Sequence, residues 1–117
     1  ILDVLVARTD ALERSPGGFR QLLAGYFQAL GYLHRAPGEA ARRMAPRLGV
    51  TPDEVQAAMK GLRFMDLASN HGWLDGPRPG LLPAAENVAR IMVSAGLMKR
   101  VPVLDALSDP RFLPEAT

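Results

Sequence analysis

The 117-residue chain contains no cysteine. This absence excludes disulfides, thiolate nucleophiles and cysteine-ligated metals, but it does not identify a compartment, because cysteine-free proteins occur everywhere. Long apolar runs are also missing, since no stretch approaches the roughly 18 uninterrupted apolar residues that a membrane span needs. Aromatic residues make up only 6% of the chain, which disfavours a base-stacking surface.

The chain has little excess charge of either sign. Fourteen Lys and Arg residues against twelve Asp and Glu give a net charge of +2. Because a nucleic-acid binder usually concentrates a larger positive excess on one face, this balance predicts no nucleic-acid partner. The 48% hydrophobic and 22% charged content is typical of a chain that folds around a core.

Residue patterns that carry catalysis are sparse. The sequence contains no G-x-S-x-G motif and no glycine-rich phosphate loop. Its two histidines, His34 and His71, do not form a metal-ligand spacing. These patterns therefore predict no catalytic residue and no metal ligand.

The first eight residues, ILDVLVAR, form a short apolar run with β-branched Val4 and Val6. This run predicts a short buried strand over 1–8. A lone strand cannot satisfy its own hydrogen bonds, so it must pair with strands that are not evident elsewhere in the chain. The Ile start and the lack of a basic segment before an apolar one lead us to expect that upstream sequence was removed or left out and that no signal peptide is present.

A long helix is predicted over 16–35. Ser15 is the expected cap, and Pro16 suits the first helical position because its missing N–H costs nothing there. Gly25 and Gly31 indicate close packing against this helix, since each lowers helix stability relative to alanine. Its expected apolar face consists of Phe19, Leu22, Leu23, Tyr26, Phe27, Leu30 and Leu33.

Further helices are predicted over 37–48, 52–60 and 81–95, so the expected fold class is mainly α, with about five helices and the one N-terminal strand. Gly49 and Gly96 are the expected stops of two of them, the latter with an apolar contact from the next residue, Leu97. The predicted inward positions are Ala40, Ala41, Met44 and Leu48, then Val55, Ala58, Met59 and Leu62, then Leu82, Ala85, Val88, Ile91, Met92 and Ala95.

Two segments lack helical periodicity. Residues 69–80, SNHGWLDGPRPG, hold three glycines and two prolines and predict an irregular loop. The proline-interrupted tail is expected to be anchored by Leu104, Leu107, Phe112 and Leu113.

Residues 40–60 are a passable match to a helix-turn-helix. Thr51 and Glu54 form the expected capping box of the second helix. Asp53 and Glu54 in its first turn would repel phosphate, which argues against DNA binding. A small DNA-binding regulatory domain nevertheless stays an alternative, with a solvated face expected for Arg42, Arg43 and Arg47.

Five polar or aromatic residues gather within ten positions and are the candidate ligand-binding group. Such residues can line a pocket. Alternatively, Asp66 and Asn70 bond to local backbone while Trp73 plugs the loop into the core. The group consists of Asp66, Asn70, His71 and Trp73, with Asp75 beside them.

The order of several segments resembles the C-terminal part of the nitrate/sulfonate/taurine-type solute-binding proteins of ABC importers, which are similar to thiamine-precursor-binding proteins. No single motif is diagnostic, and the likeness, which covers nearly the whole chain, rests on order and spacing. The segments are DVLV at 3–6 with Arg8, the long helix after Pro16, AP at 36–37 followed by EAA at 39–41, LGVTPDEV at 48–55, GLRFMDLASN at 61–70, GL at 96–97 and DPRFL at 109–113.

The resemblance implies that residues 1–117 are the helical C-terminal portion of a two-lobe α/β periplasmic binding protein whose N-terminal majority lies outside this chain. Its first strand would be the return strand after a hinge crossing. Such a protein binds a small solute, such as nitrate, bicarbonate, a sulfonate or taurine, or a pyrimidine precursor, and delivers it to an ABC permease without catalysis or cofactor. The implied location is periplasmic or otherwise extracytoplasmic, with membrane anchoring an option for the full-length protein.

A third interpretation is an interaction module that a partner chain completes. An unpaired strand edge and apolar helix faces are the features that would be covered. The isolated chain is expected to self-associate for the same reason.

Overall fold

The structure, a computed structural model, describes residues 2–115. These residues contain six α-helices, a 3₁₀ turn and no β-strand, so the mainly helical class is confirmed. The chain forms two compact units, one ending at Asp66 and one beginning at Leu67.

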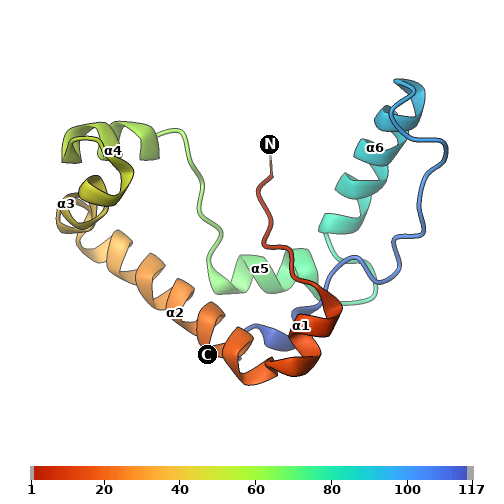
Figure 1. Ribbon diagram of the computed structural model, residues 1–117, viewed down its shortest axis with the longest axis horizontal. Coiled ribbons are helices and arrows are strands. Elements are labelled where there is room, and N and C mark those ends of the chain that lie inside the picture. Colours follow the sequence, from red (N-terminus) through yellow and green to blue (C-terminus); the bar gives the residue numbers. More distant parts are fainter. Residues whose placement is uncertain (1, 116–117) are drawn as a thin grey trace. The chain divides into compact units, whose positions relative to one another are not determined.

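Single residues before prolines join the first three helices of the first unit. Ser15 (φ −141°, ψ 58°) precedes Pro16, and Ala36 (φ −140°, ψ 60°) precedes Pro37. The proline ring disfavours the helical conformation at the residue before it and suits the first position of a helix, so each of these two prolines marks the end of one helix and the start of the next. The helices of this unit are α1 (Thr9–Arg14), α2 (Pro16–Arg35), α3 (Pro37–Leu48) and α4 (Pro52–Met59) (Figure 1).

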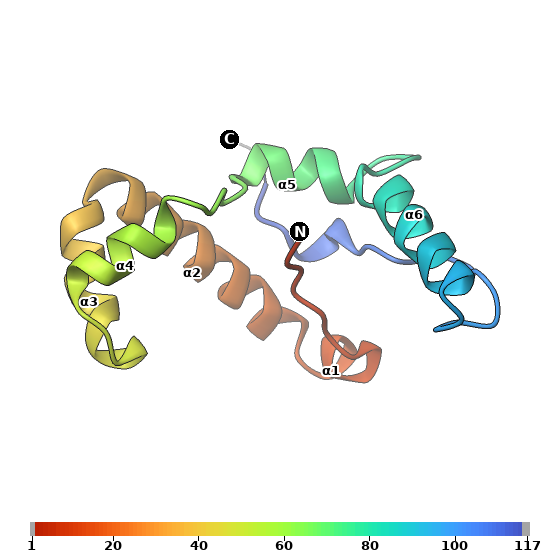
Figure 2. The same cartoon turned by 90° about the horizontal axis from the view of Figure 1, so that it is seen from above.

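The core of the first unit lies between α3 and α4, which run side by side (Figures 1 and 2). Ala41 is fully buried, and Ala45 and Val55 are nearly so, with Met59 packed against them. The small alanines let the two helix backbones approach closely, and Val55 fills the space between them. Four positions that the sequence placed inward are exposed instead, namely Met44, Leu48, Ala58 and Leu62.

The turn between α3 and α4 has the stop and start signals that the sequence predicts. Gly49 ends α3 in the left-handed conformation (φ 70°) and donates its N–H to Ala45. Thr51 and Glu54 form the predicted capping box, with the Thr51 side chain accepting from the Glu54 N–H and the Glu54 carboxylate accepting from the Thr51 N–H. The end of α3 at Gly49 and the capping box at the start of α4 were therefore both predictable from the sequence.

The predicted strand is wrong for residues 2–8, and Ile1 lies outside the described residues. The segment contains no strand, and its four large apolar side chains are 53% to 82% exposed. A strand needs a neighbouring strand for its backbone hydrogen bonds, and the described part of this chain supplies none. The helix α1, which directly follows, was missed by the sequence analysis.

Helix α2 has the predicted bounds but fewer contacts than expected. Of its apolar face only Leu30 is buried, while Leu22 and Tyr26 are exposed. The Ser15 side chain makes no capping hydrogen bond, contrary to prediction. A Cβ added at Gly25 would meet no atom within 4 Å, so no close packing explains this glycine.

The second unit contains α5 (Leu67–Leu74), α6 (Leu81–Ser94) and the 3₁₀ turn η1 (Pro110–Phe112). The loop predicted over 69–80 is wrong for its first half, which is the helix α5. Contacts from distant residues of the same unit hold this helix, and a local sequence pattern does not reveal such contacts.

Helix α6 ends as predicted at Gly96 (φ 72°), where the Leu97 N–H donates to Met92 in a Schellman motif. The Leu97 side chain, expected to make an apolar contact here, is 73% exposed. The buried residue of α6 is Ala89, whereas Val88, Ile91 and Ala95, all predicted inward, are exposed.

Candidate functional site

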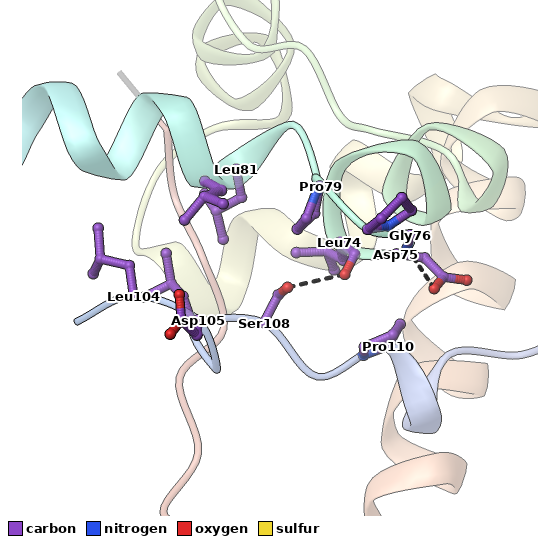
Figure 3. Close-up of a pocket in the computed structure, with 12 residues that line it drawn as sticks. Leu74, Asp75, Gly76, Pro79, Leu81, Leu104, Asp105, Ser108 and Pro110 are labelled. Carbon is purple, nitrogen blue, oxygen red and sulfur yellow. Dashed lines mark hydrogen bonds between the residues drawn. The ribbon is translucent and has the colours of Figure 1, made fainter.

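A cleft of about 280 Å³ lies in the second unit (Figure 3). One wall runs from the end of α5 to the start of α6, over residues 74–82. The other wall belongs to the tail, over residues 104–110. Its lining residues are Leu74, Asp75, Gly76, Pro77, Pro79, Leu81, Leu82, Leu104, Asp105, Leu107, Ser108 and Pro110.

Leucine and proline side chains form most of this lining, and the charged groups in it are both carboxylates, Asp75 and Asp105. One oxygen of the Asp75 carboxylate already has a hydrogen bond, since Oδ1 accepts from the Gly76 N–H at 2.7 Å. The surface exposed in the cleft is more polar than apolar, so a small polar molecule suits it better than an apolar one.

Two hydrogen bonds tie the tail to α5. The Ser108 hydroxyl donates to the Leu74 carbonyl at 2.9 Å, a bond that is drawn in Figure 3. The Pro114 carbonyl lies 3.0 Å from His71 Nε2. Because a carbonyl can only accept, Nε2 must carry the proton in this bond. The other ring nitrogen of His71 lies 3.8 Å from Asp75 Oδ2.

The tail is also anchored at η1, where Phe112 is buried as predicted. Asp109 caps this turn by accepting from the Arg111 N–H, and it also forms an ion pair with the Arg111 guanidinium at 2.6 Å. The hydrogen bond from the Arg111 side chain lowers the pKa of Asp109, with partial burial opposing it. The Arg111 guanidinium in turn lies 5.7 Å from the centre of the Phe112 ring.

The four predicted ligand-binding residues do not line the cleft. Asp66 is the last residue of the first unit, whereas Asn70, His71 and Trp73 belong to α5 in the second. His71 holds the tail, and the Trp73 ring lies 3.4 Å from where a Cβ on Gly80 would be, so Trp73 packs on the loop after α5. Trp73 belongs to a helix and is half-buried, so it does not plug a loop into the core.

Among the polar residues of the cleft, sequence reasoning found only Asp75, through its place beside the predicted group. It missed Asp105 and Ser108, which lie in the tail. Ser108 bonds to a residue 34 positions earlier in the chain. No spacing rule connects residues so far apart, so only the folded unit could reveal this pair.

The first unit holds a second hollow, an apolar groove of about 250 Å³. The Arg43 guanidinium lies over the Tyr32 ring at its edge, 5.3 Å from the ring centre. Its main lining residues are Tyr26, Leu30, Leu33, Met44, Met59 and Phe64.

The α3–α4 pair has the order of a helix-turn-helix, but the first turn of α4, which would face DNA, is acidic. Asp53 and Glu54 are exposed in the first turn of α4. Hydrogen bonds from the backbone and the hydroxyl of Thr51 lower the pKa of Glu54, which keeps its negative charge. On α3, Arg42 and Arg43 are exposed as predicted, and both pair with Glu39.

Within residues 2–115, no three His, Asp or Glu side chains group closely enough to hold a metal ion. No helix in this range combines the length and apolarity needed to cross a bilayer. Comparisons of the chain with family models, with curated proteins and with solved structures find no match.

Proposed function

We propose that this chain is the C-terminal portion of the solute-binding component of an ABC importer. In this role it binds a small solute outside the cytoplasmic membrane and passes it to a permease, without catalysing a reaction. The order of its sequence segments, together with one structural observation, supports the proposal.

That observation is the exposed apolar segment at residues 2–6. Leu2, Val4, Leu5 and Val6 are each more than half exposed, and the described chain offers their backbone no strand to pair with. Burying each such side chain fully contributes roughly 1.5–3 kcal/mol. A near-continuous apolar run is typical of a strand that is covered on both faces. A sheet in the rest of the receptor would supply both the hydrogen bonds and the cover.

The proposed solutes are nitrate, bicarbonate, taurine or another sulfonate, and aminopyrimidines. Isothermal titration of the natural gene product against this panel tests the proposal. Binding of one member with a defined stoichiometry is the expected result. A parallel measurement gives the mass of the product in its own cells and its compartment. Absence of binding by a cytoplasmic product of 12.6 kDa would overturn the proposal.

The apolar groove of the first unit favours a second candidate function, an interaction module that a partner chain completes. Helix grooves lined by Met, Leu and aromatic residues accept amphipathic helices. Light scattering over a range of concentrations separates the two candidates. A receptor portion whose surfaces are covered in the natural product should give a monomer of that product, whereas an interaction module should form a complex or self-associate.

A further inference from the structure

The tail over residues 104–114 contributes one whole wall of the cleft in the second unit. Leu104, Asp105, Leu107, Ser108 and Pro110 all line the cleft from this side. Leaving aside η1, the tail has no helix or strand of its own. Its position is therefore set by what attaches it to the rest of the unit.

Several attachments lie at defined places. Two side-chain hydrogen bonds, from Ser108 to Leu74 and from His71 to Pro114, connect the tail to α5. Both accepting groups are main-chain carbonyls, so each bond fixes the path of a backbone. Phe112, buried between the two points, adds an apolar anchor. The Ser108 bond also satisfies a carbonyl in the last turn of α5, where no intrahelical partner is available.

We propose that the tail is a latched strap that closes the cleft, with Ser108 and His71 as its two latches. Release of these latches together with Phe112 frees residues 104–114 while α5 and α6 stay folded, and removal of the strap takes one wall from the cleft. A small molecule then enters or leaves through strap release. The latches are a property of the second unit alone, and only their use as a gate rests on the proposed solute-binding function.

Limited trypsin digestion of the 117-residue chain tests the strap without a ligand. The bond after Arg111 lies inside the strap next to buried Phe112 and is protected while the strap is docked. The bond after Arg90 lies inside α6 and reports unfolding of the unit. Intact-mass spectrometry measures the product that is cut only after Arg111. Samples are taken at early times, because a cut in the exposed residues 99–101 would itself free the tail.

Loss of either latch should raise the initial rate of cleavage after Arg111 about fivefold, the change in open population that corresponds to one hydrogen bond of ordinary strength. The variants are S108A and H71F, which remove the donors. S108T and H71Q keep a donor and should cleave at the parent rate. S94A is the matched control, because it removes a hydroxyl bond of the same kind, from Ser94 to Ile91, inside α6.

Faster cleavage after Arg111 with an unchanged rate after Arg90 supports the strap. Equal increases at both bonds would mean that His71 and Ser108 hold the whole unit together, which would overturn the proposal. Unchanged cleavage in S108A and H71F would overturn it as well. The digestion contains no solute, so a negative result there would overturn the strap without bearing on solute binding. A titration without binding would count against the proposed function without bearing on the strap.

Discussion

The packing of α3 against α4 yields the sharpest stability prediction. Val55 is 3% exposed and sits against Ala41 and Ala45. Valine has two more methyl groups than alanine, and each buried carbon contributes about 0.8 kcal/mol. Because the neighbouring alanine side chains are too short to fill the space left behind, a cavity penalty adds to this loss. V55A should therefore lower the free energy of unfolding by about 2–3 kcal/mol.

Val103 provides the matched control, since V103A removes the same two methyl groups from a side chain that is 87% exposed. Its effect should stay within about 0.5 kcal/mol. Urea unfolding followed by far-ultraviolet circular dichroism measures both variants, and the slope with urea should not change. Equal unfolding midpoints for V55A and V103A would refute the assignment of Val55 to the core.

Outcomes for four further variants are expected in the same unfolding assay. T51A should lower stability by about 1 kcal/mol, because it removes the capping hydroxyl of α4. G49A should lower it by roughly 1–2 kcal/mol, since alanine resists the left-handed conformation at φ 70°, whereas G25A in open space on α2 should raise it by up to about 1 kcal/mol. The pKa of Glu54 is lowered by its bonds from Thr51, so its contribution is present above the ordinary value of 4.5 and is lost as the pH falls through the lowered value. E54Q should be less sensitive to acid than the parent over that window, and an identical acid profile would contradict this explanation.

Local chemistry determined the helix boundaries that the sequence predicted correctly. Pro16, Pro37 and Pro52 each begin a helix, because proline fixes its own backbone angle and disfavours the helical conformation at the residue before it. Gly49 and Gly96 each follow the end of a helix in the left-handed conformation, which residues with a Cβ resist. These rules act within a few residues and can be applied without knowledge of the fold.

Predictions that depended on a neighbouring strand or helix were less accurate than those of the helix boundaries. Val4 and Val6 favour a strand by residue type, yet their segment has no neighbouring strand in the described chain and forms none. Met44 and Leu48 continue the apolar spacing of α3, but α4 covers only the row that contains Ala41 and Ala45. Periodicity shows which residues share a face, whereas the position of the neighbouring helix decides how much of that face is buried.

The sequence by itself therefore determined the mainly helical class, the helix-starting prolines, the glycine stops and the capping box of Thr51 and Glu54, because each depends on backbone groups a few positions apart. Only the tertiary structure decided that residues 69–74 are helical and that Ser108 and His71 tie the tail to α5 beside a cleft. Those bonds join residues 34 and 43 positions apart, so they form only when the chain between them has folded back.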